Sequence, residues 1–226
     1  MRFVKTYINP DFSFNSIIFT YSVSLITCLI IAIDFIHNNN VWEQRKLKDS
    51  FEFLQNNSLS RAELSNEVTD YYNIHYGDIL VKYGEVLDLS CDEPTYLKDE
   101  SLLAKMSSSL LRNGDIIMAD AAEDETVGKC SEIKGLRGNR TVSGLHTIPL
   151  RPKKEYAQGY LGYYMNSSSY HDQLLPLMQG TKVSSISKSA IAETMIFEPV
   201  SKLEQEKIGA YFIQLDNLIT LHQRKP

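Results

Sequence analysis

Basic side chains gather in a glycine-interrupted stretch over residues 128–140, and their chemistry suits contact with an anionic polymer. Gly135 and Gly138 separate the cations, so a flexible loop is expected here. The candidate contact residues are Lys129, Lys134, Arg137 and Arg140. Cations on such a loop can bind phosphate oxygens, and arginine can also bond the edge of guanine through two parallel hydrogen bonds. The stretch fits nucleic-acid contact and equally fits a solvated loop.

Two further polar segments could serve the same chemistry. After Gly180, hydroxyl and ammonium groups alternate, and the candidate contacts are Thr181, Lys182, Ser184, Ser185 and Lys188. The other segment, 56–61, carries Asn57 and Arg61, with Ser60 as the expected cap of a short helix. The alternative for each is a polar surface loop.

Sequence signatures of catalysis are missing from this chain. It has no glycine-rich phosphate loop ending in Lys-Ser/Thr, no Asn/Asp-Pro-Pro-Tyr/Phe step of an adenine methyltransferase and no recognisable nuclease carboxylate pair. The acidic run 123–125 is interpreted as a solvated loop, and three widely separated cysteines suggest neither a zinc site nor a disulfide framework. His146 has no partner that the sequence places beside it, so a structural role is expected. The chain is therefore predicted to be non-catalytic, with no metal site.

Short glycine-aspartate steps suggest a sheet that would position these polar segments. Residues 75–82 and 112–119 both read as a turn, Gly-Asp and then a short apolar run, which predicts two buried strands. Residues 141–151 predict an edge strand ended by prolines. Residues 155–168 predict a helix whose tyrosines belong to the core edge or could stack on bases.

The last segment of the chain has the clearest local signals. Glu198-Pro199 should end the preceding element, and Ser201 stands three residues before Glu204, the spacing of a capping box. Apolar residues then recur every three or four positions, which places them on one helical face. The expected subunit-contact residues on this face are Leu203, Ile208, Phe212, Leu215 and Ile219. Their partner is either the preceding domain or another chain.

The order of residues in this segment resembles the end of a target-recognition unit. The matching steps are Gly180-Thr181-Lys182, Pro199, Leu203-Glu204-Gln205, Ile208 and the helix that ends at 215–219. Such units belong to the specificity subunit of bacterial type I restriction–modification systems, and the likeness extends from about residue 41 to the end of the chain.

The resemblance implies both a fold and a set of partners. The expected fold is α/β (α+β), with a mixed or antiparallel sheet, flanking helices and a long C-terminal dimerisation helix. The expected parts are an unmatched leader at 1–40, a DNA target-recognition domain at 41–198 and the helical segment 199–226. Implied partners are double-stranded DNA, methyltransferase subunits that modify adenine and a restriction subunit. S-adenosylmethionine, ATP and Mg²⁺ are expected on those partner subunits and not on this chain.

Size is where the chain departs from the family pattern. A full specificity subunit carries two recognition domains, and this chain of 226 residues matches one. We therefore expect a half-subunit that pairs with itself and reads a two-fold symmetric site. A non-functional half-gene remnant is the alternative.

Composition and the leader bear on partners and localisation. A net charge of −5 argues against a generally basic nucleic-acid binder but allows a local basic face. Three reduced cysteines fit a cytoplasmic protein. Residues 17–33 are uncharged and near the length of a membrane span, although polar residues dilute them. The leader is thus a membrane anchor of an interaction protein, a poorly ordered or helical extension, or the product of a rearranged gene.

Overall fold

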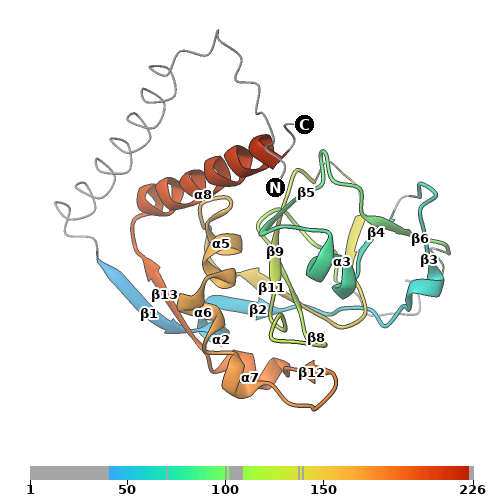
Figure 1. The fold of residues 1–226 in the computed structure, drawn as a ribbon, viewed down its shortest axis with the longest axis horizontal. Helices are drawn as coiled ribbons and strands as arrows, with labels where there is room; N and C mark the ends of the chain where they lie inside the picture. The colour runs from blue at the N-terminus through green and yellow to red at the C-terminus, as the bar shows by residue number, and fades with distance from the viewer. Residues whose placement is uncertain are drawn as a thin grey trace, which may run out of the picture. The chain divides into compact units, whose positions relative to one another are not determined.

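The computed structural model describes residues 41–69, 71–99, 101, 109–136, 138 and 140–223. The predicted leader and Arg137 lie outside this part of the chain. None of the helices within it is both long and apolar enough to cross a membrane. The chain separates into two compact units, 1–41 and 42–226, so the C-terminal helix belongs to the same unit as the recognition domain. Figure 1 labels the helices and strands of this second unit.

A five-stranded sheet forms the centre of the unit. Its strands are β2 (Phe51–Phe53), β11 (Thr147–Pro152), β7 (Ile116–Ala119), β9 (Cys130–Lys134) and β5 (Val86–Asp88), in that spatial order. All neighbours are antiparallel except the β5–β9 pair. Along β7, alternate side chains enter two different cores: Ile116 and Met118 join one, and Ile117 and Ala119 the other. Both faces of the sheet are therefore covered.

Helices α5 (Tyr160–Asn166) and α6 (Ser168–His171) contribute to the larger core. Tyr160 stacks on Tyr156 and Tyr164, with ring centroids 6.4 and 5.8 Å apart. These rings are buried or half-buried, so the tyrosines of 155–168 serve the core and not base stacking. The carboxylate of buried Glu132 accepts bonds from the Gly159 and Gly162 amides at 2.7 and 3.0 Å, which ties α5 to β9.

Two predictions for individual elements were wrong. Residues 75–82 do not form a strand: Tyr76–Val81 is helix α3, because the His75 ring caps the Gly77 amide at 3.1 Å and Asp78 lies in the first turn. Strand β11 is interior and not an edge strand. Within it, Pro149 lies opposite Ile117 of β7, and its carbonyl accepts a bond from the Leu54 amide at 2.9 Å.

The domain has a second sheet of four strands. It orders β10 (Arg140–Ser143), β4 (Tyr71–Ile74), β6 (Thr95–Leu97) and β3 (Leu64–Ser65), with β10 and β4 parallel. The 3₁₀ helix η1 (Arg61–Glu63) precedes β3, and the predicted cap is present: Ser60 and Glu63 form a capping box.

Smaller elements complete the unit. Strands β1 (Trp42–Lys46) and β13 (Met195–Pro199) form a ribbon that begins and ends the domain, with α2 (Leu47–Ser50) after β1. Strands β8 (Ala121–Ala122) and β12 (Ser184–Ser185) pair beyond the end of β7, and the 3₁₀ helix η2 (Leu175–Leu177) and α7 (Lys188–Ala192) flank β12 in sequence.

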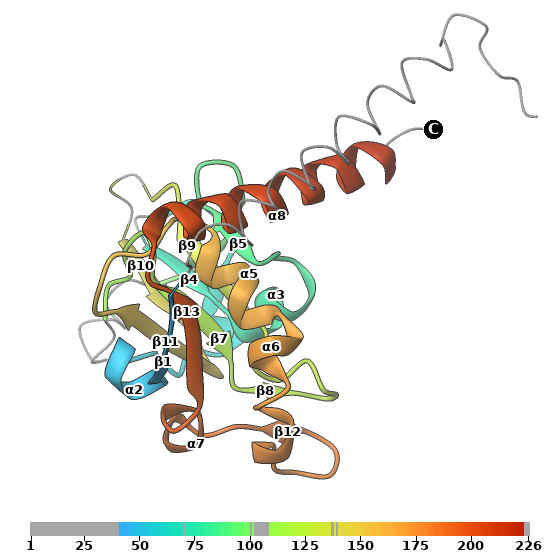
Figure 2. The ribbon, with the colours of Figure 1, turned by 90° about the vertical axis from the view of Figure 1, so that its left-hand side faces the viewer.

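The last helix, α8 (Lys202–Gln223), confirms the C-terminal prediction. Its first half packs on α5, where a Cβ at Gly209 would lie only 3.0 Å from the Gln158 carbonyl oxygen. The Tyr163 hydroxyl donates to Asp216 at 2.6 Å. The second half extends beyond the sheets (Figure 2). The predicted α/β fold with a mixed sheet, flanking helices and a long terminal helix is thus observed.

Candidate nucleic-acid interface

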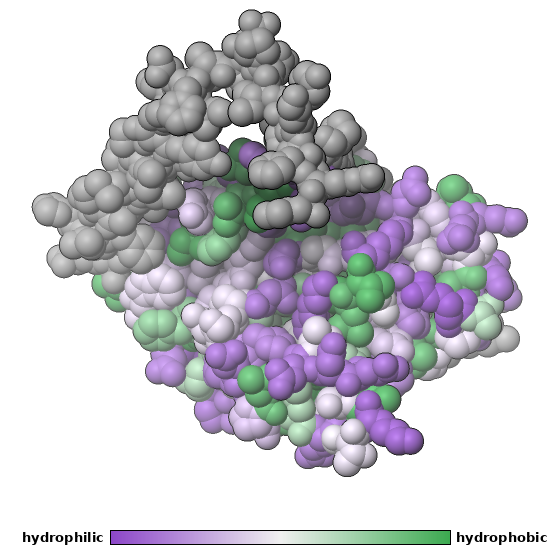
Figure 3. Space-filling model, viewed as in Figure 1, coloured by the Kyte–Doolittle hydropathy of each residue, from purple (hydrophilic) through white to green (hydrophobic). Residues whose placement is uncertain are grey.

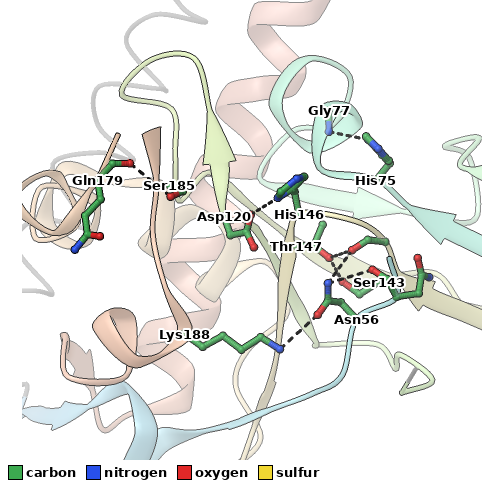
Figure 4. A network of polar contacts seen from close by, with 12 residues as sticks. Asn56, His75, Gly77, Asp120, Ser143, His146, Thr147, Gln179, Ser185 and Lys188 are labelled. Atoms are coloured by element: carbon green, nitrogen blue, oxygen red, sulfur yellow. Dashed lines mark hydrogen bonds and ion pairs between the residues drawn. The ribbon is translucent and has the colours of Figure 1, made fainter. Parts of the chain in front are cut away.

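A chain of polar contacts crosses the domain where β7 ends, where β10 turns into β11 and where α7 begins (Figure 4). We call it the polar face. Its members are Asn56, Arg61, Tyr76, Asp120, His146 and Lys188. They come from five separate segments of the chain, so only the folded protein brings them together.

His146 and Asp120 lie at the centre of the polar face. The His146 Nδ1 is 3.2 Å from the Asp120 Oδ1, and the Asp120 amide donates to the His146 carbonyl at 3.1 Å. The ring of Tyr76 meets the His146 ring edge-on, with centroids 5.3 Å apart. His146 has φ of 54°, and it is the one non-glycine residue in the described part of the chain with a left-handed backbone. Its side chain is still 51% exposed.

Lys188 and Asn56 extend this arrangement on one side. The Lys188 ammonium donates to the Leu54 carbonyl at 3.2 Å and lies 3.5 Å from the Asn56 amide oxygen. Asn56 in turn donates to the Gly144 carbonyl at 3.3 Å, in the turn that carries His146. Burial lowers the pKa of Lys188 and raises the pKa of Asp120, while attraction between the two groups opposes both shifts. The two charges therefore offset each other within the face.

Arg61 is the last residue of the polar face on the side of α3. Its guanidinium donates two 2.9 Å bonds to the Asp78 carboxylate, which is only 11% exposed, while about half of the arginine side chain remains exposed. Asp78 belongs to α3, as does Tyr76, so the ion pair and the His146 contact share one helix. Burial, reinforced by the Arg61 charge, lowers the pKa of the neighbouring His75 and favours its neutral form. The neutral ring can then cap α3.

The residues predicted after Gly180 belong beside this face. Thr181 and Lys182 are exposed in the loop before β12, and Ser184 pairs with Ala122 of β8. The Ile186 amide donates to the Asp120 carbonyl at 2.9 Å, which fixes this segment next to the central pair. Lys188 of this segment and Asn56 of the segment 56–61, which were predicted separately, therefore meet at one surface.

Asn57 was predicted to contact DNA, but its side chain does not lie at the surface. Its side chain is almost fully buried: the amide donates to the Asn73 oxygen at 2.7 Å, and its own oxygen accepts from the Leu59 amide at 3.1 Å. Asn57 thus supports the loop from inside while its neighbour Asn56 lines the surface network.

The basic stretch 128–140 is not the flexible loop that was expected. Much of it is β9, because Cys130 and Ile133 are buried in the cores on either side of the sheet. Lys129 donates to the Leu80 carbonyl at 3.0 Å, and Lys134 pairs with Asp88 at 3.1 Å. Arg140 lies over the Tyr71 ring at 5.2 Å. Lys129, Lys134 and Arg140, the three of these cations that the structure describes, are each engaged by the protein at different elements and do not form one patch.

The chain matches the family model of the type I restriction modification DNA specificity domain over residues 39–226. It belongs to this family. A search of curated protein sequences finds no match. In the residues of this specificity domain that the structure describes, no three or more His, Cys, Asp or Glu side chains are arranged to hold a metal ion.

Solved structures share the fold of this specificity domain. The S subunit of a type I restriction–modification system from M. genitalium gives a TM-score of 0.53 at 17% identity, covering 82% of this chain and 42% of its own. The HsdS subunit from Thermoanaerobacter tengcongensis gives 0.50 at 18%, covering 81% and 39%. A chain from a structure on complex assembly and conformational transition of the type I R-M system gives 0.54 at 16%, covering 90% and 47%. The specificity domain spans less than half the length of each.

The predicted subunit-contact residues divide into two groups on α8 of this specificity domain. Ile208 packs against the domain's own core, and Phe212 stacks on Tyr163 with centroids 5.3 Å apart. The remaining apolar groups are exposed, and hydrophobic surface is visible at the level of α8 in the space-filling view (Figure 3). We call these the α8 stripe: Tyr211, Leu215, Leu218 and Ile219. Leu203 is also exposed, at the start of the helix.

Tyr76 and Asp120 of the polar face were not predicted from the sequence, and neither was the exposed position of His146 in this specificity domain. His146 was expected to be structural because no partner stood near it in the sequence. The fold supplies Asp120, 26 residues earlier, and leaves the ring at the surface. The available signal was an isolated aspartate directly after the buried strand β7, among small apolar residues.

Proposed function

We propose that this chain is the DNA-recognition subunit of a type I restriction–modification complex. It directs partner methyltransferase subunits to adenines within one target and guides ATP-dependent restriction by a further subunit. S-adenosylmethionine, ATP and Mg²⁺ act on those partners. Membership of the DNA specificity family supports this proposal, and we propose the polar face as the DNA-contacting surface of the domain.

The observation that carries the proposal is the convergence of hydrogen-bonding groups from five segments at one surface. Arginine, asparagine, histidine and lysine are the side chains that bond base edges and phosphates in protein–DNA complexes. Here Arg61 and His146 are each held by a carboxylate and each remain half exposed. Groups fixed in this way lose little conformational entropy when they bind DNA. Lys182, exposed in the adjoining loop, suits phosphate contact.

A second recognition domain comes from a second copy of the same chain. The α8 stripe supports this pairing, because apolar side chains in register on one helical face favour contact with another helix. Such a pair has a two-fold axis, so its two recognition domains would read inverted copies of one half-site. The expected target is therefore symmetric.

Selection from a random double-stranded DNA library tests the recognition function. The full-length chain is mixed with its methyltransferase subunit, bound DNA is recovered, and several rounds of enrichment are sequenced. The proposal predicts enrichment of one short motif in inverted repeat. Recovery of DNA with no shared motif would contradict it.

A further inference from the structure

We propose that His146 is a specificity-determining residue whose Nε2 accepts a hydrogen bond from an exocyclic amine of the target DNA, on adenine or cytosine. This inference rests on the proposed DNA-recognition function. It assigns the residue and the base chemistry, which the family does not specify.

The first support is the backbone of His146. With φ of 54°, it occupies a left-handed conformation that costs energy for any residue with a Cβ and almost none for glycine. Strained backbones of this kind concentrate at functional sites, where surrounding contacts enforce them. At His146 the enforcing contacts are the backbone bond from Asp120 and the side-chain bond to the same residue. The left-handed backbone places the His146 side chain at the surface and not in a hydrophobic core.

The second support is the direction of the ring. A carboxylate only accepts hydrogen bonds, so the Nδ1 facing Asp120 carries a proton. In the neutral ring, Nε2 is then an acceptor, and the edge-on contact with Tyr76 limits rotation of the ring plane. Within the described ranges, Nε2 has no hydrogen-bond partner. The Nε2 atom of His146 is thus an oriented hydrogen-bond acceptor at the surface of the domain.

A hydrolytic role does not fit this geometry. A histidine–aspartate pair activates a hydroxyl or thiol only when that group is bonded to the other ring nitrogen. The nearby hydroxyls of Ser143 and Thr147 bond to each other at 2.6 Å, and Thr147 also donates to the Gly144 carbonyl. Among the described residues, no nucleophile is paired with His146.

The donors and acceptors on the base edges then determine which bases the Nε2 atom can bind. In the major groove, hydrogen-bond donors are the N6 amine of adenine and the N4 amine of cytosine, while guanine presents only acceptors. An acceptor at Nε2 matches the two amines and disfavours guanine. Lys188 and Arg61, on either side, carry only hydrogen-bond donors and cannot accept from these amines, so this selection falls to the histidine.

The test replaces His146 with glycine, which removes the ring and relieves the backbone. The selected target and a panel with each base pair changed in turn are measured by competition binding. The His146→Gly chain should lose roughly tenfold of its discrimination at one base position where the wild type prefers adenine or cytosine. Its affinity for non-specific DNA should not change. Its Tm should rise by a few degrees, since glycine accepts this φ.

Two further variants make the result decisive. Asp120→Ala frees the ring and should weaken discrimination at the same base position. Asn113→Ala, an exposed turn residue that precedes β7, at the end away from the polar face, should leave every position unchanged. Full base preference in His146→Gly, or an equal loss at all positions, would overturn the inference while the recognition function stands. A wild-type chain that selects no target would overturn that function and the inference with it.

Discussion

The polar face and the α8 stripe are built on opposite principles. Exposed polar groups on the face already have partners inside the protein: Arg61 has Asp78, and His146 has Asp120. In the stripe, Leu215 and Leu218 are 39% and 49% exposed. Polar groups gain specificity from fixed geometry, whereas apolar groups gain free energy only when another surface covers them. The polar face therefore has its partners in place before it binds DNA, whereas the α8 stripe gains a covering surface only when it binds another helix.

Helix α8 both packs on the recognition domain and carries the stripe. One side of the helix is anchored at Gly209, where a larger residue would meet the Gln158 carbonyl oxygen, and at Asp216, which accepts a bond from Tyr163. The stripe runs along the same helix from Tyr211 to Ile219. The anchored turns hold the stripe at a defined angle to the recognition domain, so the spacing of two paired domains is set by the helix.

The largest expected effect comes from charging the stripe. Leu215→Asp combined with Leu218→Asp should weaken self-association by roughly a hundredfold, because two carboxylates would be desolvated in the helix contact. The Tm of the monomer should change little, since both positions are exposed within one chain. Sedimentation velocity over a dilution series measures the effect. Asn217→Asp, which adds charge on another side of the same helix, is the control. Equal weakening by the control would show that the stripe is not the contact.

Separating Arg61 from Asp78 should have the next largest effect. Arg61→Ala leaves the Asp78 carboxylate nearly buried without its partner, which should destabilise the fold by about 1–2 kcal/mol after allowance for the half-exposed arginine. A double-mutant cycle with Asp78→Ala, read by urea unfolding, should give a coupling of about 1 kcal/mol. A coupling near zero would mean that this pair does not pre-organise the polar face.

A smaller effect distinguishes Lys182, which has no ion-pair partner among the described residues, from an ion-paired cation. Lys182→Ala should reduce DNA affinity about threefold and lower the slope of log affinity against log salt by about 1. Lys134→Ala, whose ammonium pairs with Asp88, should leave both quantities nearly unchanged. Fluorescence anisotropy from 50 to 200 mM salt, roughly the range where counterion release is resolved, measures both. The reverse order would move the interface to the basic stretch 128–140.

The smallest expected effect is a pH dependence of stability at Asp120. Burial raises the folded pKa of Asp120 above its ordinary value of about 4. Between these two values the folded state binds more protons, so stability falls as pH rises and the full cost is present above the folded pKa. Asp120→Asn carries no charge to bury. Its stability relative to the wild type should therefore improve by less than about 1 kcal/mol from pH 3 to pH 7.

Urea unfolding of both chains at several pH values measures this difference. A constant offset between them, reflecting the changed hydrogen bond to His146, is compatible with the account. A relative stability of Asp120→Asn that falls with rising pH would contradict it.

Local signals in the sequence predicted the elements that depend on local chemistry. The Ser201 and Pro199 boundaries and the apolar spacing gave α8, and the Ser60 cap gave η1. The same Gly-Asp step, however, precedes a strand at Ile116 and lies within helix α3 at Tyr76–Val81. The difference arises from His75, which caps the helix, and from Arg61, which pairs with Asp78 from 17 residues away.

The site was less predictable because its pairs are tertiary. Sequence reasoning selected Arg61, Lys182 and Lys188 by residue type, and the fold brings their segments together. It could not place Asp120 beside His146, or the Asn57 side chain inside the domain, since both depend on contacts between distant strands and loops. Cations of 128–140 looked available in sequence because strand β9 was not recognised there.

Mapping of adenine methylation in living cells tests DNA recognition and self-pairing together. The full-length chain would be co-expressed with its methyltransferase subunit in a host lacking other adenine methylation, and modified positions read by single-molecule sequencing. We expect methylation at one reproducible motif with two-fold symmetry, lost in the Leu215→Asp, Leu218→Asp chain. Methylation at an asymmetric motif would contradict self-pairing, and no methylation at any motif would contradict the recognition function itself.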